Sequence, residues 1–155
     1  MKINTRPSTL SDIAPIVTNL LDSGLDDIRR LKANAVLHLT SDYLQDECFT
    51  FEADTGELVG IFGIGEDGCI WLHMTKVVDQ CPIAFIRACK RIVNSLERPM
   101  LYNTIDIQNT SLIKFIKHLG FKVINVVAVE PSNNYHVEIV KLWHGWPPSR
   151  QVPGS

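Results

Sequence analysis

The stretch from Pro99 to Phe121 constrains the fold of this chain more than any other part of the sequence. Its first part, as far as Ile105, is rich in apolar residues and predicts a buried strand. Three good N-cap residues follow, namely Asn109, Thr110 and Ser111. One apolar helical stripe comes next, made of Leu112, Ile113, Phe115, Ile116 and Leu119. Gly120 is the residue expected just past a helix end, so the stretch predicts a strand, a turn, a helix and another strand.

The polar turn from Asp106 to Ser111 lies at the start of that predicted helix. A helix N-terminus presents free backbone N–H groups, which suit an anion or a carbonyl group. The turn could therefore hold a ligand. An ordinary β-α-β connection that binds nothing explains the same pattern, and the residues leave both interpretations open.

Two helices are predicted upstream, between residues 10 and 36. The first has an apolar stripe, and Asp12 stands three residues after Thr9 as in a capping box. Pro15 removes one backbone donor, so this helix either starts near Asp12 or bends at Pro15. The second helix takes Ser23 as its N-cap, and its apolar residues are Leu25, Ile28, Leu31, Ala35 and Val36.

The middle of the chain predicts an antiparallel meander. Its strands are residues 48–53, 58–64 and 69–76, joined by turns that contain glycine. Trp71, His73 and Thr75 share one face of the third strand. Other strands are expected at residues 2–5, 123–129 and 136–143, and a helix after Pro82. The order β-α-α-β-β-β-α-β-α-β-β indicates a mixed α/β (α+β) fold with helices on a largely antiparallel sheet.

Composition narrows the class of protein. A chain of 155 residues predicts one domain. The net charge of −2 and the pI near 6.2 argue against nucleic-acid binding. No run of 18 apolar residues exists that would predict a membrane span, and the first residues lack the apolar core of a secretory signal. We therefore expect a cytoplasmic protein.

The four cysteines do not predict a metal site. Cys48, Cys69, Cys81 and Cys89 form no C-x-x-C pair and have no histidine at a zinc-like spacing. A structural role is expected for them, because free cysteine behaves as a small hydrophobe. Cys81 differs from the others, because it stands beside Pro82 at a probable helix start that could lower the pKa of its thiol.

Two motifs resemble the GCN5-related N-acetyltransferases, the GNAT superfamily. Asn109 followed eleven residues later by Gly120-Phe121, with an apolar helix between, resembles the closing motif of that family. Residues 3–13 are similar to its first strand and first helix, and the resemblance covers roughly residues 2–142. The segment F-I-K-H-L-G-F, with no glycine-rich loop upstream, looks most like small acetyltransferase-like proteins of tailed phages. The expected organisation is one GNAT-like domain over residues 1–143 and an irregular tail over residues 144–155.

The resemblance implies an acyl-coenzyme A site between the fourth and fifth strands, residues 69–76 and 100–106. Acetyl-CoA would serve as cosubstrate. The family usually has R/Q-x-x-G-x-G/A in the loop that cradles the pyrophosphate, whereas this chain has no glycine from Lys76 to Pro82. In this loop the resemblance assigns Lys76, Gln80 and Cys81 to the cofactor. Further positive charge for the phosphates could come from Arg87 or Lys90.

The resemblance also assigns catalytic roles. A backbone N–H near Met74 or Thr75 would stabilise the oxyanion. His73 is the best candidate for a general base, since its ordinary pKa is near 6.5, but a packed or surface histidine without function is the more common case. Lesser candidates are Asp106 and Glu57. The tyrosine that the family commonly uses as general acid, seven residues after the Asn, is here Ile116; Tyr102 could substitute for it or be a buried structural residue. Asn109 and Ser111 could bond the pantetheine arm or only cap the helix.

Two functions stay open from the sequence. The first is an acetyl-CoA-dependent N-acetyltransferase acting on a small amine or a protein amine. The second is a catalytically inactive GNAT-fold phage protein, in the host cytoplasm or the virion, that binds a host or virion protein. Its partner surface would include Trp143 and Trp146, unless these residues fold back over the sheet edge.

Overall fold

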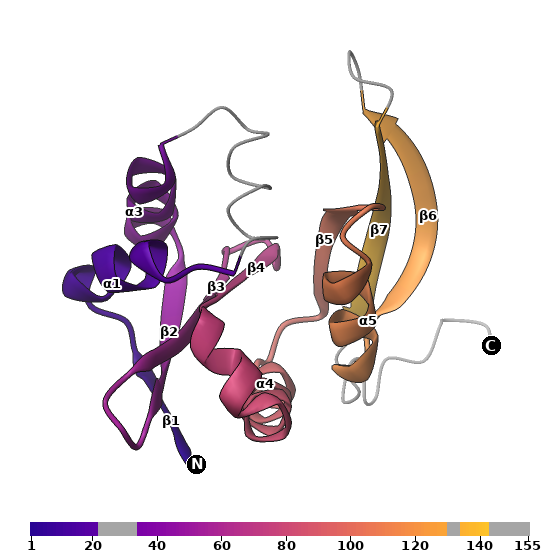
Figure 1. Ribbon diagram of the computed structural model, residues 1–155. Helices are drawn as coiled ribbons and strands as arrows, with labels where there is room; N and C mark the ends of the chain where they lie inside the picture. The colour runs from indigo at the N-terminus through magenta and orange to yellow at the C-terminus, as the bar shows by residue number, and fades with distance from the viewer. Residues whose placement is uncertain (22–33, 130–133, 143–155) are drawn as a thin grey trace. The chain divides into compact units, whose positions relative to one another are not determined.

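The computed structural model describes residues 1–21, 34–129 and 134–142, and these divide into two compact units (Figure 1). Unit 1 is Met1–Cys89 and unit 2 is Lys90–Ser155. Both units combine helices with antiparallel strands, which confirms the mixed α/β class. One domain over residues 1–143 stays a prediction. The tail from residue 144 and the residues Trp143 and Trp146 lie outside the described residues.

Unit 1 is built on a four-stranded antiparallel sheet. Its strands follow chain order: β1 (Ile3–Pro7), β2 (Glu47–Ala53), β3 (Leu58–Ile64) and β4 (Ile70–Met74). The meander predicted from the sequence is confirmed, and its two turns contain Gly56 and Gly68 at φ angles of 89° and 96°. The prediction that the third strand reaches residue 76 was wrong. Thr75 instead caps a 3-10 helix, η2 (Lys76–Gln80), because its side chain accepts the N–H of Val77.

One face of this sheet packs against two short helical segments and a longer helix. These are η1 (Leu10–Asp12), α1 (Ile13–Thr18) and α3 (Ala35–Gln45). Of the two predicted alternatives, the structure has the one in which the first helix starts near Asp12. Pro15 then lies in the first helical turn, where the backbone N–H groups need no intrahelical partner. The core on this side consists of Ile13, Ile16, Leu20, Leu39, Cys48 and Ile61.

The predicted second helix falls mainly on residues 22–33, outside the described residues. Its last members, Ala35 and Val36, instead open α3, which the sequence analysis missed. The physical reason is the side chain of Asn34, which accepts the N–H groups of Val36 and Leu37 at 3.0 and 3.2 Å. An asparagine cap of this kind starts a new helix at that residue.

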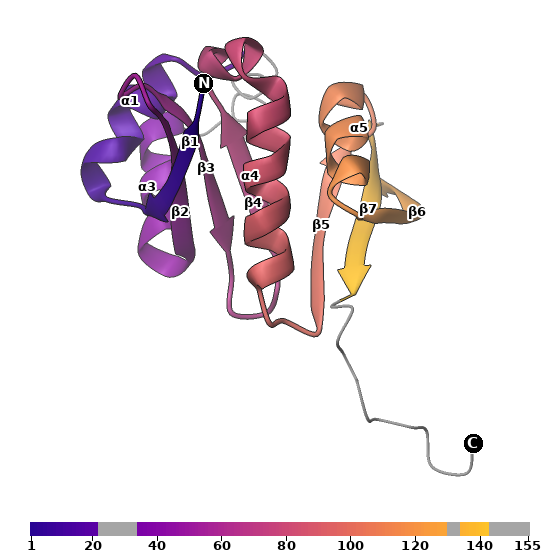
Figure 2. The ribbon, with the colours of Figure 1, turned by 90° about the horizontal axis from the view of Figure 1, so that it is seen from below.

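The helix α4 (Pro82–Ser95) crosses the boundary between the units, and its unit 1 part, residues 82–89, packs against the opposite face of the sheet (Figure 2). Phe85 meets Phe51 of β2 edge to face, with ring centroids 5.1 Å apart. Two glycines of β3 allow close packing, one on each face. A Cβ at Gly60 would lie 2.8 Å from the carbonyl oxygen of His73 and 3.4 Å from the Phe85 ring, and a Cβ at Gly63 would overlap the Trp71 ring.

Unit 2 contains a three-stranded antiparallel sheet of order β5-β7-β6. Its elements are β5 (Met100–Asp106), α5 (Thr110–His118), β6 (Lys122–Val129) and β7 (Asn134–Leu142). The predicted strand, turn, helix and strand from Pro99 to Phe121 are confirmed. The side chain of Asn109 accepts the N–H of Leu112 at 3.3 Å, and Gly120 ends the helix at a φ of 96°. The core residues of this unit include Leu101, Ile105, Ile116, Leu119, Phe121, Val137 and Ile139.

Candidate functional site

The outer edge of β4 presents backbone N–H groups that could take part in a reaction. The N–H of Thr75 donates to the carbonyl oxygen of Val59 at 2.9 Å, inside the β3–β4 pairing. In an antiparallel pair alternate residues face the neighbouring strand, so the N–H groups of Leu72 and Met74 point away from β3. Of the two predicted oxyanion donors, Thr75 therefore has its N–H occupied by β3, whereas the Met74 N–H lies on the side of β4 that faces away from β3.

The segment after α1 closes one end of this edge. The N–H of Leu21 donates to the Met74 carbonyl at 3.0 Å, and the N–H of Lys76 donates to the Asn19 carbonyl at 2.9 Å. These two bonds form an isolated antiparallel bridge between Leu20 and Thr75. They fix the position where the backbone of β4 turns into η2, and they leave the Met74 N–H beside this fixed point.

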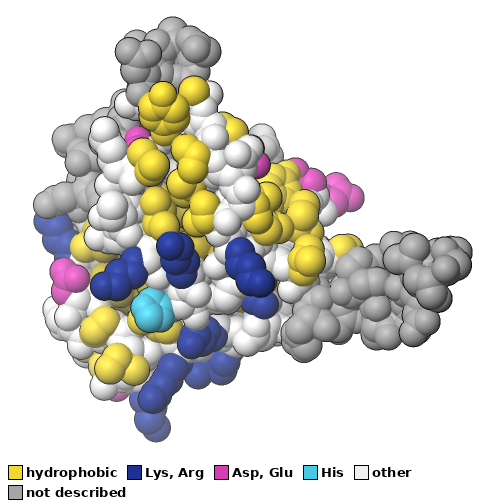
Figure 3. Space-filling view, turned by 90° about the vertical axis from the view of Figure 1, so that its right-hand side faces the viewer, with side chains coloured by type: hydrophobic (Ala, Val, Ile, Leu, Met, Phe, Trp, Pro, Cys, Tyr) yellow, Lys and Arg dark blue, Asp and Glu magenta, His cyan; other side chains and the backbone are white. Residues whose placement is uncertain are grey.

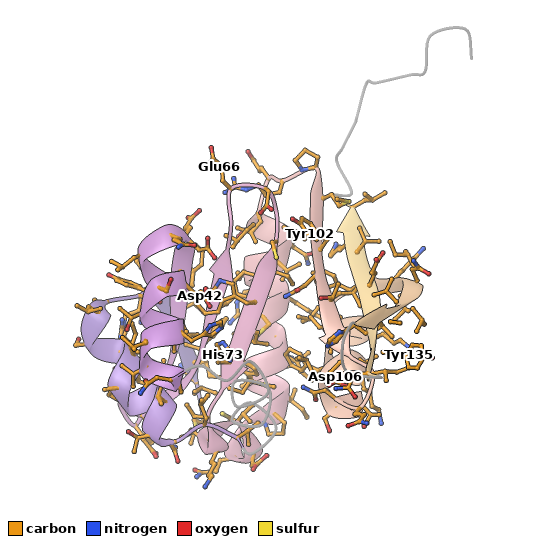
Figure 4. All side chains as sticks on the ribbon, turned by 90° about the horizontal axis from the view of Figure 1, so that it is seen from above. Asp42, Glu66, His73, Tyr102, Asp106 and Tyr135 are labelled. Carbon is orange, nitrogen blue, oxygen red and sulfur yellow. The ribbon has the colours of Figure 1, made fainter. Side chains whose placement is uncertain are left out.

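His73 lies on the helix-covered face of β4, next to Trp71, with ring centroids 5.6 Å apart (Figure 4). Burial lowers the pKa of His73 to about 4, and the charge of His38 on α3 lowers it further in the same direction. The imidazole is therefore neutral near pH 7 and has a free nitrogen lone pair. A neutral histidine can accept a proton, although its low pKa makes it a weak base.

Polar groups of α3 and its C-cap lie on the same side of the sheet as His73. His38 lies 3.4 Å from a carboxylate oxygen of Asp42 one turn later, and burial raises the pKa of Asp42. The indole N–H of Trp71 donates to Asp46 at 2.7 Å, which holds the Trp71 ring beside His73. The sequence analysis did not anticipate these helix residues, because α3 itself was missed.

The predicted pyrophosphate loop is η2 followed directly by α4. Several of its N–H groups are used internally: Val77 donates to the Thr75 hydroxyl, Val78 to the Thr75 carbonyl and Cys81 to the Val78 carbonyl. The first helical bond of α4 joins the Phe85 N–H to the Cys81 carbonyl. The N–H groups of Ile83 and Ala84 therefore precede the hydrogen-bonded ladder and are available to an anion. The side chains of Lys76 and Gln80 are exposed at the same place.

Cys81 does not have the lowered thiol pKa suggested for a helix N-terminus. Burial raises the pKa of this thiol, and the sulfur lies 3.5 Å from the Val77 carbonyl. Burial likewise raises the pKa values of Cys48, Cys69 and Cys89. The suggestion was wrong because the side chain points into the protein and loses solvation of its charged form. A role for Cys81 in cofactor binding stays a prediction.

The remaining candidates belong to unit 2. Tyr102 is half-buried on β5 opposite Val140 of β7, and Asn109 caps α5 while Ser111 is exposed in its first turn. Asp106 is buried and accepts the N–H of Gln108 at 2.9 Å. Ile116, at the position of the family tyrosine, is buried in the core. Since His73 and Tyr102 lie in different units, their meeting in one site stays a prediction.

An ion pair between the half-buried Arg6 and the buried Asp12 in unit 1 was also missed. Arg6 of β1 donates two hydrogen bonds of 2.9 Å to Asp12, and its Nε donates to Glu52 at 3.1 Å. Burial alone would raise the pKa of Asp12, but bonds from Arg6, the Thr9 N–H and the Thr50 hydroxyl hold that pKa near 2. This cluster lines a surface pocket of about 410 Å³. The only signal in the sequence was the capping-box spacing of Thr9 and Asp12.

Within residues 1–21, 34–129 and 134–142, no group of three or more His, Cys, Asp or Glu side chains is placed to hold a metal ion. No helix in the same part of the chain is long and apolar enough to cross a membrane.

The order of strands and helices is that of the GNAT acetyltransferase fold, and comparison with solved structures shows the same fold. A GNAT-family acetyltransferase from Bacillus cereus ATCC 10987 has a TM-score of 0.69 at 11% identity, over 92% of this chain and 98% of that chain. A chimera of the spermidine N-acetyltransferase SpeG from Vibrio cholerae and hSSAT has a TM-score of 0.67 at 12% identity, over 92% and 96%. Apo YjaB from Escherichia coli has a TM-score of 0.63 at 16% identity, over 90% and 97%. No family model and no curated protein sequence matches the chain.

Proposed function

We propose that this protein transfers the acetyl group of acetyl-coenzyme A to an amine nitrogen. The observation that carries the proposal is the outward N–H of Met74 on the free edge of β4, in a fold shared with acetyltransferases. An N–H group fixed in a sheet is oriented before the reaction begins, so it can stabilise charge on a thioester oxygen without reorganisation.

The proposed reaction is a direct transfer. The amine nitrogen attacks the thioester carbonyl, and the developing oxyanion is bound by the Met74 N–H. The C–S bond then breaks, and the coenzyme A thiolate takes up a proton. His73, neutral near pH 7, receives the proton that the amine loses, and Tyr102 supplies the proton for the thiolate.

Cofactor binding is assigned to groups at two helix starts. The N–H groups of Ile83 and Ala84, with the side chains of Lys76 and Gln80, would meet the pyrophosphate. Asn109 and Ser111, at the start of α5, would bond the pantetheine arm while Asn109 also caps the helix. The backbone of Thr75 and the buried Cys81 would shape this region through their internal bonds rather than bind the cofactor directly.

The test is isothermal titration with acetyl-CoA and, separately, with free coenzyme A. We expect micromolar binding, followed by acetyl transfer to at least one member of a panel of amines that includes spermidine. No binding at millimolar acetyl-CoA would overturn the proposal.

A second test removes the proposed oxyanion donor. Because the Met74 N–H is not part of the β3 ladder, Met74→Pro removes the donor with no loss of a ladder bond.

A matched variant separates the N–H from the side chain. Met74→Ala keeps the N–H and removes most of the side chain, so it should retain turnover better than Met74→Pro. One lost oxyanion donor reduces kcat by roughly 100-fold or more. Equal kcat values in the two variants, with both proteins folded, would refute the role of the Met74 N–H.

A second candidate function is favoured by the loop that precedes α4. Its N–H groups at Val77, Val78 and Cys81 are occupied, and Ile116 offers no proton. These features suit a catalytically inactive GNAT-fold protein. In this second hypothesis such a protein would be phage-borne and would bind a host or virion protein. Absence of coenzyme A binding in the titration, with a stable fold, would favour this candidate.

A further inference from the structure

The Trp71 side chain is held in place by contacts on three sides. Its indole N–H donates to a carboxylate oxygen of Asp46 at 2.7 Å. Gly63 lies directly opposite in the β3–β4 register, and the indole ring fills the space that a Cβ would occupy there. The third contact is with His73, whose ring centroid lies 5.6 Å from that of Trp71 at an interplanar angle of 41°. The indole ring therefore bounds one side of the space around His73.

Asp46 is itself fixed by the backbone on both sides. It is the C-cap of α3, and its backbone N–H donates to the Asp42 carbonyl at 2.9 Å. β2 begins at the next residue, where Glu47 pairs with Ile64 of β3. A hydrogen bond to an ionised acceptor is shorter and stronger than one between neutral groups, and the 2.7 Å bond from Trp71 is of that kind. The end of the helix and the start of the strand thus determine where the indole N–H finds its acceptor.

We propose that Asp46 is a positioning residue for His73 and that it acts through Trp71. The inference rests on the proposed function, in which His73 takes up the proton that the amine loses. The bond from the indole N–H to Asp46 keeps the ring over Gly63. The ring in turn limits the orientation of His73 and excludes water from that side. A base held in this way is oriented before the substrate arrives, which is where much of a catalytic group's efficiency comes from.

The hydrogen bond of Asp46, rather than its charge, carries this role. A carboxylate close to an imidazole favours the charged form and raises its pKa. The pKa of His73 is instead lowered to about 4, first by burial and then by the charge of His38. Removal of the Asp46 charge alone should therefore leave His73 unaffected, whereas removal of the hydrogen-bond acceptor should not.

Other titratable groups lie on this side of the sheet and respond to the charge of Asp46. Burial and, to a smaller extent, this charge raise the pKa of Asp42, while His38 lowers it. Burial, joined by the charge of Asp46, also raises the pKa values of the Cys48 and Cys69 thiols. Asp46→Asn and Asp46→Ala remove the charge equally, so a comparison of the two variants cancels its effect on these neighbours.

The first test measures the pKa of His73 by NMR in the intact protein, with the His73 signal identified from its loss in His73→Gln. Asp46→Ala releases the indole and admits water, so the pKa of His73 should rise by about one unit or more. Asp46→Asn keeps an oxygen acceptor, so the pKa should stay within about 0.3 unit of the wild type. The signal of His118, exposed on α5, serves as an internal reference; Figure 3 shows a histidine at the molecular surface beside Lys and Arg side chains.

Trp71→Phe is the second variant, because it keeps an aromatic ring and removes the N–H donor. It should shift the pKa of His73 in the same direction as Asp46→Ala. The double variant should shift it no further than the larger single change, because both substitutions remove the same bond. Trp71→Phe also decides the question if Asp46→Ala does not fold. Glu66→Ala is the matched control, since it removes an exposed carboxylate from the turn between β3 and β4 and should leave His73 unchanged (Figure 4).

The second test measures acetyl transfer. Asp46→Ala should lower kcat by about tenfold and change KM by less than about twofold, because a misplaced base slows the chemical step more than binding. The acidic limb of the kcat/KM profile should move to higher pH by the shift seen in NMR, since this profile reports the base in the free enzyme. Asp46→Asn should restore both quantities. If the wild type transfers no acetyl group, the proposed function has failed, and the NMR measurement alone decides the inference.

Three results would overturn the inference. The first is an unchanged pKa of His73 in folded Asp46→Ala and folded Trp71→Phe. The second is an equal shift in Asp46→Asn and Asp46→Ala, because the charge rather than the hydrogen bond would then be responsible. The third is a shifted pKa of His73 in an active enzyme whose kcat/KM profile does not move, because His73 would then not be the base that Asp46 positions.

Discussion

The low pKa of His73 predicts a specific loss of stability on acidification. In the unfolded chain this imidazole has its ordinary pKa of 6.5, and in the folded protein burial holds the pKa at about 4. The unfolded state therefore binds the proton first as the pH falls. The contribution of His73 to stability is complete above about pH 6.5, is lost progressively below it, and is fully lost below about pH 4.

The size of the effect follows from the two pKa values. Each pKa unit corresponds to about 1.4 kcal/mol, so the complete shift corresponds to about 3 kcal/mol. Between pH 7 and pH 5 the expected loss in unfolding free energy is about 2 kcal/mol. His73→Gln has no titrating group at this position, so its unfolding free energy should decrease by correspondingly less over the same interval.

Urea unfolding at half-unit steps from pH 7.5 to pH 4.5 measures this difference. The carboxylates, including Asp42 with its raised pKa, are present in both proteins, so the difference between the two curves isolates His73. His118→Gln is the matched control, since His118 is exposed on α5, and its curve should follow the wild type. Parallel curves for the wild type and His73→Gln would refute the assignment of a buried, neutral imidazole.

Three other changes test the structure and the proposed site. Asp12→Asn should lower the unfolding free energy in urea by about 2 kcal/mol, because it removes the charge that accepts two hydrogen bonds from Arg6 while Glu52 still binds Arg6, and a change below 1 kcal/mol would contradict that role. Gly63→Ala should destabilise the fold by about 1–3 kcal/mol in thermal unfolding, because its Cβ overlaps the Trp71 ring; an unchanged melting temperature would be inconsistent with this packing. Asn109→Ala should cost about 1 kcal/mol as a lost cap and also weaken acetyl-CoA binding in titrations, whereas Asn109→Asp keeps the cap; full affinity in Asn109→Ala would remove the residue from the cofactor site.

The sequence predicted the fold best where local signals agreed with one another. From Pro99 to Phe121 the apolar stripe, the N-cap and the terminal glycine all indicated the same helix, and the structure has it. The meander from Cys48 onward was equally clear, because its turns contain Gly56 and Gly68 at positive φ. In these regions local backbone preferences and burial coincide.

Prediction failed where a single side chain decided the outcome. Helix α3 begins at Ala35, after the cap Asn34, and the apolar spacing across Leu31, Ala35 and Val36 concealed that boundary. The third strand ends before residue 75, because the Thr75 hydroxyl donates to the Leu58 carbonyl at 2.7 Å and accepts the Val77 N–H. The Thr75–Leu58 hydrogen bond joins two strands that meet only in the folded sheet, so the local sequence around Thr75 does not predict it.

The candidate site, too, was predicted only in part from the sequence. The residue type and strand of His73 followed from the sequence, but its lowered pKa depends on packing under α3, which no local pattern encodes. Likewise, the sequence named Met74 and Thr75 together as oxyanion donors. Only the register of β3 against β4 separates them, because it assigns the Thr75 N–H to Val59.

The two glycines of β3 have a consequence for the ancestry of this chain. A side chain at Gly60 would meet a backbone carbonyl of β4, which no substitution in that strand removes, and a side chain at Gly63 would require a simultaneous change of Trp71. Exposed positions such as Leu37 and Leu44 are under no such restriction. Lineages descended from this sequence should therefore diverge widely over the helix surfaces while they keep G-x-x-G in β3. That short pattern, with the indole opposite its second glycine, would identify distant descendants after overall identity has fallen too low to be informative.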